Sequence, residues 1–460
     1  MQIRRIGAGL AAAALLITLA SCGKDEKEAA KFERADTESF VRQMSDVSSF
    51  TLDNGIVVYL QEERTNDQVA VEFLYRAGFM DEPKGKAQLS HIAEHLAIYC
   101  AAGAYGPDES YKAVSDSHGM ISAEAVSDFS HIDYIVNTDS LEQALRIEQG
   151  RMSGIRCDEQ IRQREMAKAI GEIDAVMANP KGSLAKYGMM ALNQTLYYGA
   201  RTVPIIQGAR DITCPEAEAF IHETFRPDDT VIVIIGNVDK ARAEALVRKY
   251  FAGIPRRPHP ETVRKPVPGN INASWDIDGG NALYFVAPGP YDNFRERLIL
   301  TMFGSYLHQV LMTSEEVYVP CRSVYASNQI YRVDDIPFFV FAEPGQGHTI
   351  DDIRPVVKQY LESAIASLND SRVQAITGSM VSFATSTGLK KDVADYPLMH
   401  HQVIGQEALN VGMRHALREG RSTEDFVAEI NSVTPDEFRA VVNKYVNASR
   451  LQEISFSSRK

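Results

Sequence analysis

The chain has few cysteines and no excess of positive charge, and each shortage excludes a class of protein. It has five cysteines in 460 residues, and no two of them have the C-x-x-C spacing of a structural zinc site. The formal net charge is −13, from 48 basic and 61 acidic side chains, so the clustered Lys and Arg of a nucleic-acid surface are not expected. With 45% hydrophobic and 24% charged residues, the composition is that of an ordinary globular protein long enough for two domains.

The chain also lacks long hydrophobic runs, except at its N-terminus. Arg4 and Arg5 precede an apolar run from Ala8 to Ala20, which is too short for an ordinary transmembrane helix and has the plan of an export signal. The sequence Leu19-Ala20-Ser21-Cys22 resembles a bacterial lipoprotein box, which implies that residues 1–21 are removed and Cys22 is lipidated. Plain secretion with an incidental Cys22 is the alternative.

A lipoprotein of this kind has an expected location. Residues 22–45 are polar and read as a flexible tether. We therefore expect an exported protein, held to the outer membrane of a Gram-negative bacterium only through its lipid, on the periplasmic face or the cell surface. A disulfide is possible in such an oxidising compartment, but the sequence does not pair the remaining cysteines, which are Cys100, Cys157, Cys214 and Cys321.

The most informative motif is His91-Ile92-Ala93-Glu94-His95. On a helix, positions i, i+3 and i+4 share one face, so His91, Glu94 and His95 point the same way. Two imidazoles one turn apart can bind one tetrahedral zinc ion, and the carboxylate beside them is well placed to accept a proton from a water molecule that zinc activates. This H-x-x-E-H order is the inverzincin signature of zinc peptidases. The alternative is a helix with two surface histidines and a solvated glutamate.

The segment around this motif resembles the pitrilysin, insulinase and mitochondrial-processing-peptidase family of inverzincin metallopeptidases, in its short bacterial two-unit type. The stretch 77–83 resembles the family's Gly-x-x-Asp-Glu segment, and Glu165 and Glu172 have the spacing of its Glu-x6-Glu pair. The resemblance implies one zinc ion per chain, bound by His91, His95 and Glu172, with Glu165 orienting a ligand histidine. Without the upstream motif, the two glutamates would read as charges on a solvated helix face.

The expected fold class is α+β, with two duplicated α/β units in which helices pack on an antiparallel-rich sheet. The predicted divisions are a metal-binding unit at 46–254, a proline-rich linker at 255–270 and a C-terminal unit without the metal motif at 271–460. The sequence pattern predicts a hairpin at 50–60, strands at 68–75, 231–235, 281–286 and 451–456, and helices at 142–152, 158–177 and 294–312, with further helices opening at 213–216 and 433–437.

The substrate-binding side departs from the family pattern in two places. Gly119-Met120-Ile121-Ser122-Ala123 resembles the family's Gly-x-x-Asn-Ala strand, but Ser122, beside Ala123, replaces the asparagine. Met312 lies where active members offer an arginine from their C-terminal unit, while Tyr318 and Tyr325 are candidates for the tyrosine that accompanies it. The resemblance implies a dimer, since short members of the family pair two chains to form one catalytic chamber. This dimer is a homodimer or, because methionine cannot donate a hydrogen bond, a heterodimer with a related subunit that supplies the arginine.

These observations leave three readings of the function. The leading one is a zinc-dependent endopeptidase that hydrolyses peptides or unfolded polypeptides, with Glu94 as general base. The second is a non-catalytic peptide-binding or scaffold subunit of a heterodimeric peptidase; the intact ligand set argues against it, while Ser122 and Met312 argue for it. The third is a lipoprotein of another α/β class with a chance motif.

Overall fold

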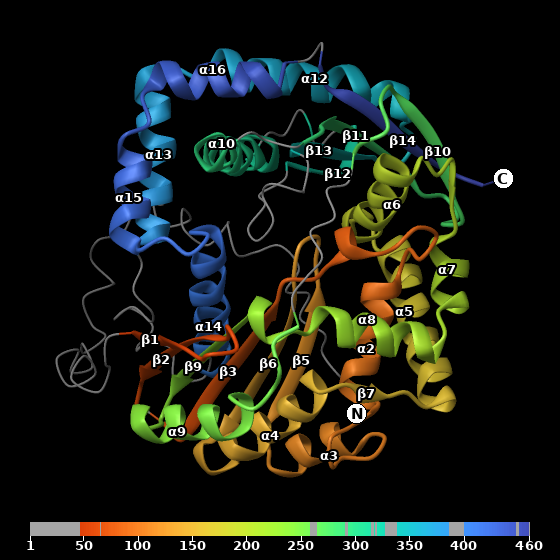
Figure 1. The fold of residues 1–460 in the computed structure, drawn as a ribbon. Helices are drawn as coiled ribbons and strands as arrows, with labels where there is room; N and C mark the ends of the chain where they lie inside the picture. The colour runs from red at the N-terminus through yellow and green to blue at the C-terminus, as the bar shows by residue number, and fades with distance from the viewer. Residues whose placement is uncertain are drawn as a thin grey trace, which may run out of the picture.

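A computed structural model of the chain describes residues 47–64, 66–257, 265–289, 293–313, 317, 320–326, 338–385, 400–447 and 450–459. These residues form two six-stranded sheets covered by helices, one sheet in each half of the molecule (Figure 1). The predicted α+β class with two α/β units is confirmed. The export signal, Cys22, the tether, Tyr318 and part of the predicted linker lie outside the described residues.

The first sheet has the order β1-β2-β9-β3-β6-β5. All its neighbouring strands are antiparallel except β2 and β9, and β5 forms one edge. The predicted hairpin joins β1 to β2, where Gly55 has φ +100°, and a Cβ there would lie 2.9 Å from the Cα of Asp228. The strands are β1 (Ser48–Thr51), β2 (Val57–Glu62), β3 (Gln68–Tyr75), β5 (Met120–Ala125), β6 (Ser130–Asn137) and β9 (Thr230–Gly236).

The outer face of this sheet packs on a layer of helices. Its core includes Val71 and Phe73 of β3, Ile232 of β9, Leu96 and Phe251, all of which are buried. The helices are α2 (Leu89–Tyr99), α4 (Leu141–Met152), α5 (Glu159–Ala178), α8 (Cys214–Thr224) and α9 (Lys240–Phe251). The helices predicted at 142–152 and 158–177, and the one opening at 213–216, are therefore confirmed, as are the strands at 68–75 and 231–235.

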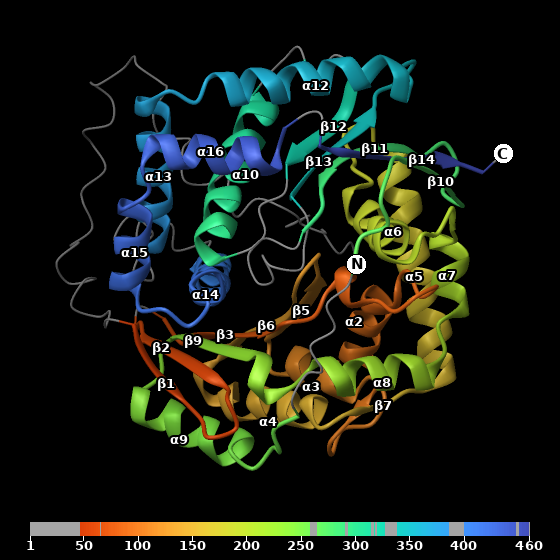
Figure 2. The ribbon, with the colours of Figure 1, turned by 45° about the horizontal axis from the view of Figure 1, so that its top comes forward.

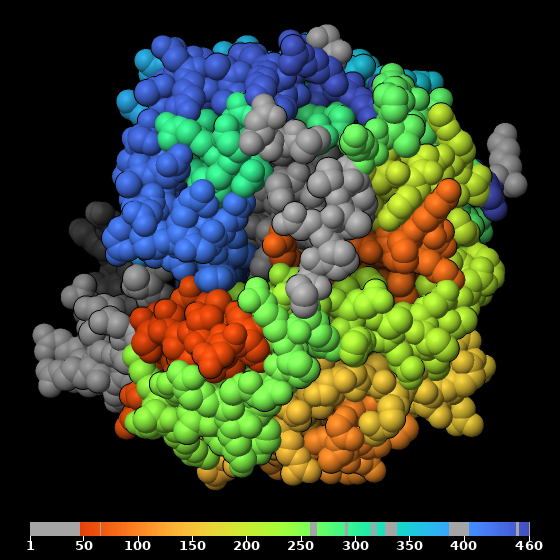
Figure 3. All heavy atoms as spheres, in the orientation of Figure 1, coloured from red at the N-terminus to blue at the C-terminus, as the bar shows by residue number. Residues whose placement is uncertain are grey.

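The inner face of the first sheet is covered by α14 (His400–Leu417), a helix from the C-terminal part of the chain. Leu74 and Val233 of the sheet pack against Ile404, Ala408 and Val411. Figure 2 shows α14 on the opposite side of the sheet from α9. The space-filling view shows the same helix, in blue, directly against the red segment of β1 and β2 (Figure 3). The two halves of the chain thus share a core at this sheet.

The second sheet has the order β12-β13-β11-β14-β10-β8. Its strands are β8 (Thr202–Val203), β10 (Ile271–Trp275), β11 (Asn281–Ala287), β12 (Cys321–Ala326), β13 (Phe338–Pro344) and β14 (Gln452–Ser458). One face packs on helices of the C-terminal part, which are α10 (Phe294–Thr313), α12 (Ile350–Ala366), α13 (Asp370–Ala384), α15 (Thr423–Asn431) and α16 (Pro435–Tyr445). The predicted strands at 281–286 and 451–456 and helices at 294–312 and 433–437 are present.

The other face of the second sheet packs on α6 (Ala185–Tyr198), which precedes the predicted linker in the sequence. The short strand β8 also joins this sheet, parallel to β10. α6 and β8 therefore belong to the second sheet although they precede the predicted linker at 255–270, just as α14 follows the linker but packs on the first sheet.

Smaller elements complete the fold: η2 (Phe79–Asp81), β4 (Ala101–Ala102), α3 (Glu109–Asp116), η3 (Thr138–Ser140), β7 (Ile155–Arg156), α7 (Ile205–Asp211) and η4 (Pro227–Asp229).

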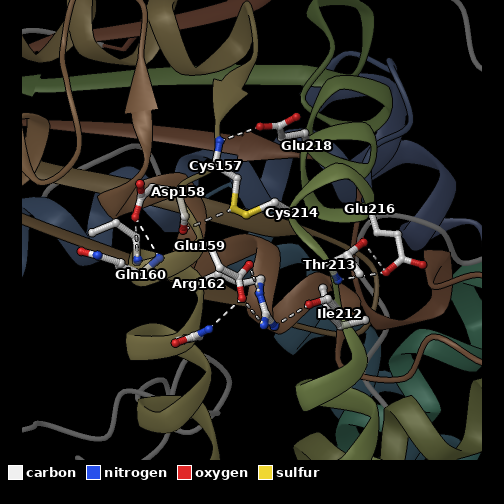
Figure 4. Close-up of a disulfide and its surroundings, with 12 residues drawn as sticks. Cys157, Asp158, Glu159, Gln160, Arg162, Ile212, Thr213, Cys214, Glu216 and Glu218 are labelled. Atoms are coloured by element: carbon white, nitrogen blue, oxygen red, sulfur yellow. Dashed lines mark hydrogen bonds and ion pairs between the residues drawn. A yellow bond between two sulfur atoms is a disulfide. The ribbon is translucent and has the colours of Figure 1, made fainter.

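A disulfide between Cys157 and Cys214 links the N-terminal ends of α5 and α8 (Figure 4). The two Cα atoms lie 5.3 Å apart, and the residues are 57 positions apart in the chain. Glu218 of α8 accepts a hydrogen bond from the Cys157 backbone N–H at 2.6 Å, which strengthens the same junction. The start of α5 is therefore fixed.

Among the described helices, none combines the length and the hydropathy of a transmembrane span.

Candidate metal centre

Helix α2 presents the H-x-x-E-H residues on one face while its other face lies in the core. Ile92 and Leu96 are buried in the core of the first sheet. His91 is fully buried, and the side chains of Glu94 and His95 are 12% and 11% exposed. This division follows from the helical period, because the three motif positions lie within one turn of one another.

Helix α5 brings Glu172 to the two histidines. Its Oε2 lies 3.2 Å from Nε2 of His91, and its Oε1 lies 3.8 Å from Nε2 of His95. In a tetrahedral site with bonds of about 2.1 Å, two ligand atoms lie about 3.4 Å apart. The three side chains predicted as ligands therefore converge at the separation that one zinc ion requires, and their nitrogen and oxygen donors are of the kind zinc binds.

Each histidine is held by a partner on its other ring nitrogen. Nδ1 of His91 lies 2.8 Å from Oε1 of Gln88, and Nδ1 of His95 lies 3.3 Å from Oε2 of Glu165. A bond at Nδ1 fixes the ring and leaves Nε2 as the metal-facing atom. The other carboxylate oxygen of Glu165 accepts hydrogen bonds from Arg164 and Lys168 at 2.7 Å each.

Gln88 is a residue that the sequence interpretation missed. It precedes α2 with φ +80°, a left-handed conformation that is uncommon for glutamine. Its distance of three positions from His91 is the signal that could have found it. That signal is useful only when the first residue of α2 is known, because the left-handed backbone of Gln88 at the N-cap places its side chain beside the His91 ring.

The electrostatics of the cluster favour the ligand-ready forms of His91 and Glu172. For His95, burial lowers the pKa, but the hydrogen bond to Glu165 and the charges of Glu94 and Glu172 outweigh burial and raise it. Burial, assisted by the positive charge of Lys186, lowers the pKa of His91 to about 3, so its imidazole is neutral. Burial opposes the ionisation of Glu172, but its contacts with His91 and the charge of His95 outweigh burial and lower the pKa of Glu172 to about 2. A neutral imidazole and an ionised carboxylate are the forms that bind a metal ion.

Glu94 lies beside the cluster and is held by different partners. Its Oε2 accepts a hydrogen bond from the backbone N–H of Ala125 on β5 at 2.8 Å, and Nζ of Lys186 on α6 lies 3.8 Å from the same oxygen. Burial raises the pKa of Glu94 although Lys186 and His95 act in the opposite direction. A fixed carboxylate with a raised pKa suits a general base. Lys186 carried no sequence signal, because only tertiary packing brings α6 to this point.

The residues predicted to bind substrate lie in different environments. Ser122 on β5 donates a hydrogen bond to Asp133 Oδ1 at 2.8 Å, whereas Ala123 packs on the outer core. Tyr325 is 8% exposed, and its ring packs against neighbouring aromatic rings within the second sheet's core. Met312, near the end of α10, is 49% exposed. Of the residues predicted to bind substrate, Ser122 therefore presents a polar group on the inner face of the first sheet, whereas Ala123 and Tyr325 pack in cores.

Comparison with known proteins agrees with this fold. Residues 211–377 match the family model described as the peptidase M16 inactive domain. The match begins after Glu172, so it does not include the residues of the candidate metal centre. No curated protein sequence matches the chain.

Several solved structures are similar over most of the chain. One is a protease from Helicobacter pylori, with a TM-score of 0.63 and 15% identity, covering 89% of this chain and 99% of that one. Another is a peptidase M16 inactive domain from Pseudomonas fluorescens, with a TM-score of 0.62, 14% identity and coverage of 90% and 98%. A third is the periplasmic protease PqqL from Escherichia coli, with a TM-score of 0.57, 13% identity and coverage of 90% and 45%.

These similarities establish an M16-like peptidase fold. Together with the matched domain, they support the M16 peptidase family to which the sequence motifs pointed. The chain spans less than half the length of PqqL, so a structure of this kind also occurs as one part of a longer protease.

Proposed function

We propose that this chain is a zinc-dependent endopeptidase that hydrolyses peptides or unfolded polypeptides, with one catalytic zinc ion per chain. The observation that carries the proposal is the convergence of His91, His95 and Glu172, each ring fixed through Nδ1, with the buried carboxylate of Glu94 beside them. Chance surface histidines would not be buried or held by separate hydrogen-bond partners.

The division of roles follows from the contacts. His91 and His95 would hold zinc through Nε2 and Glu172 through its carboxylate; zinc, when bound, lowers the pKa of water and polarises a peptide carbonyl. Glu94 takes the proton from the attacking water and passes it to the leaving amine. Because Ala125 fixes only one Glu94 oxygen, the other is available for this transfer. Lys186 limits the rise in the pKa of Glu94, so the Glu94 carboxylate stays ionised down to a lower pH.

Strand β5 suggests how a substrate lies. It forms the edge of the first sheet, and its end at Ala125 contacts the proposed base. An extended peptide can add to such an edge through backbone hydrogen bonds, which places its carbonyls beside Glu94 without strong dependence on side chains. This geometry fits unfolded or short peptides better than folded proteins.

A second candidate is a non-catalytic subunit of the same family. The description of the matched domain as inactive favours it, and so do the exposed Met312, in place of the expected arginine, and Ser122, in place of asparagine. Both candidates are compatible with pairing to a related subunit, because PqqL is about twice the length of this chain.

We also propose an exported, lipid-anchored location, which the Cys157–Cys214 disulfide supports because disulfides persist in oxidising compartments.

Zinc-loaded wild-type protein and Glu94→Gln, assayed on a library of quenched fluorescent peptides, separate the two candidates. The isosteric Gln leaves the ligands in place, so we expect equal zinc content and a fall in cleavage of about 10²- to 10⁴-fold. Equal cleavage by the two proteins would remove Glu94 as the base. Zinc binding without cleavage, both alone and in the presence of a related subunit, would favour the non-catalytic subunit.

A further inference from the structure

A second group of metal-type side chains lies on the inner face of the first sheet, on three neighbouring strands. Glu72 is on β3, His131 and Asp133 are on β6, and Glu124 is on β5. Glu72 lies directly opposite Asp133, and Glu124 opposite His131. Because residues at i and i+2 share one face of a strand, all four side chains lie on the same face, the one that α14 partly covers.

The distances within this group resemble those of a coordination site. Nδ1 of His131 lies 3.0 Å from Oε1 of Glu72 and 3.7 Å from Oδ1 of Asp133. Ligand atoms of all three residues lie within 4.8 Å of one another. Bonds of about 2.1 Å at right angles, as in octahedral coordination, place neighbouring ligand atoms about 3.0 Å apart. The group is therefore compact enough for one ion to contact all three.

The two closest atoms have no hydrogen bond. Glu72 is 1% exposed and His131 is 8% exposed, and neither Oε1 of Glu72 nor Nδ1 of His131 is hydrogen-bonded. They lie 3.0 Å apart, which is an ion pair when His131 is protonated, but they do not form a hydrogen bond. Leaving two buried polar atoms unbonded is costly, and buried groups of this kind normally have a partner. A cation between them would satisfy both at once.

The remaining contacts support the same arrangement. Nε2 of His131 faces Oε2 of Glu124 at 3.8 Å, and Ser122 donates a hydrogen bond to Asp133 at 2.8 Å. A carboxylate behind the second nitrogen of a ligand histidine is the usual support of a metal site. The side chains of Asp133 and Glu124 are 26% and 30% exposed, which leaves a route for an ion to enter.

We propose that Glu72, His131 and Asp133 form a second metal site, separate from the His91 centre, for a divalent transition-metal ion. One imidazole and two carboxylates suit Zn²⁺ or Mn²⁺. Such an ion would join β3 to β6 and, through Glu124 and Ser122, would steady the edge strand β5. This site does not depend on the proposed peptidase function.

The test is a count of bound metal in four proteins after equilibrium dialysis, with Zn²⁺ in one series and Mn²⁺ in another. The proteins are the wild type, Glu172→Ala, Asp133→Asn and the double variant. We expect about two zinc ions in the wild type, about one in each single variant and none in the double variant. Asp133→Asn is isosteric and partly exposed, so it retains the fold. Asp116→Asn, an exposed carboxylate on α3, is the matched control and should bind as much metal as the wild type.

The outcomes separate the two sites. If Asp133→Asn binds as much of both metals as the wild type, the second site does not exist, whatever Glu172→Ala shows. If Glu172→Ala retains one ion that Asp133→Asn loses, the second site exists even where the peptidase proposal fails. As a further check, Glu124→Gln should lower the affinity of the second site for its metal ion by about 10- to 100-fold. It should not abolish binding, because Glu124 only supports the histidine.

Discussion

Glu165 lies with its buried carboxylate 3.3 Å from Nδ1 of His95, on the ring edge opposite Nε2. Glu172, two turns further along α5, lies 3.8 Å from that Nε2. One helix therefore supplies both the proposed ligand and the group that orients its neighbour. The disulfide between Cys157 and Cys214 anchors the start of this helix. The precision of the centre thus depends on how firmly α5 is held.

Removing Glu165 should weaken zinc binding without abolishing it. Glu165→Ala deletes the partner of His95 Nδ1, so we expect the zinc affinity to fall by about 10- to 100-fold, as for other supporting carboxylates. Competition with a fluorescent chelator measures this change. Glu159→Ala removes an exposed carboxylate from the same helix and should leave the affinity unchanged. An unaltered affinity in Glu165→Ala would mean that His95 needs no orienting partner.

Removing the charge of Lys186 should move the pH dependence of cleavage. The ammonium lies 3.8 Å from Glu94 and lowers the pKa of that carboxyl against the effect of burial. Lys186→Met removes this effect, the pKa of Glu94 rises, and the base is protonated at higher pH. The acid limb of the kcat/KM profile should therefore shift to higher pH. Lys181→Met, an exposed lysine before α6, is the control. A shift to lower pH, or none, would contradict the assigned contact.

Acid should loosen the contact between α14 and the first sheet. Arg418 donates to the Tyr59 hydroxyl, which donates to Nδ1 of His415, and burial with the charge of Arg418 lowers the pKa of His415 to about 4. Between about pH 6.5 and pH 4, the unfolded chain binds a proton that the native chain does not, so stability falls as pH falls, by up to roughly 3 kcal/mol.

His415→Gln keeps an acceptor for Tyr59 and cannot titrate in this range. Its thermal midpoint should therefore depend less on pH than that of the wild type. The exposed His222→Gln should keep the wild-type dependence. Parallel pH profiles for the wild type and His415→Gln would show that this histidine is not the group responsible.

Reduction should destabilise the protein through the Cys157–Cys214 link. The bond closes a loop of 57 residues, and the chain-entropy relation gives a stabilisation of about 4 kcal/mol for a loop of that length. Urea unfolding with and without a reductant measures it. The Cys157→Ser/Cys214→Ser double variant should match the reduced wild type and should not respond to the reductant. A response equal to that of the wild type would assign the effect to another pair.

Local periodicity was enough to predict that three residues of the candidate centre share one helix face. The structure forms the helix α2 over all three motif residues, His91, Glu94 and His95. They share one face because they lie within five residues of one another on that helix. Glu172 came from its spacing and the family resemblance, since no local pattern joins α5 to α2. Gln88 and Lys186 were missed because one depends on the backbone conformation at a helix start and the other on the packing of α6.

The larger arrangement depended on contacts that the sequence pattern does not specify. The strands and helices of both units were predictable from hydrophobic periodicity, but the pattern of α14 does not state which sheet it covers. In the structure, Ile404 and Ala408 pack on the first sheet although they follow the second in the chain. The pairing of Cys157 with Cys214 was likewise open, because it depends on how α5 and α8 meet.

The most direct test of the account is the zinc content of the wild-type protein beside Glu172→Ala, measured after dialysis at a free zinc concentration near the dissociation constant of a catalytic site. The account predicts that the variant binds about one zinc ion fewer per chain than the wild type while its circular dichroism spectrum is unchanged. Equal zinc content in the two proteins would contradict a metal centre built from His91, His95 and Glu172, and with it the proposed peptidase.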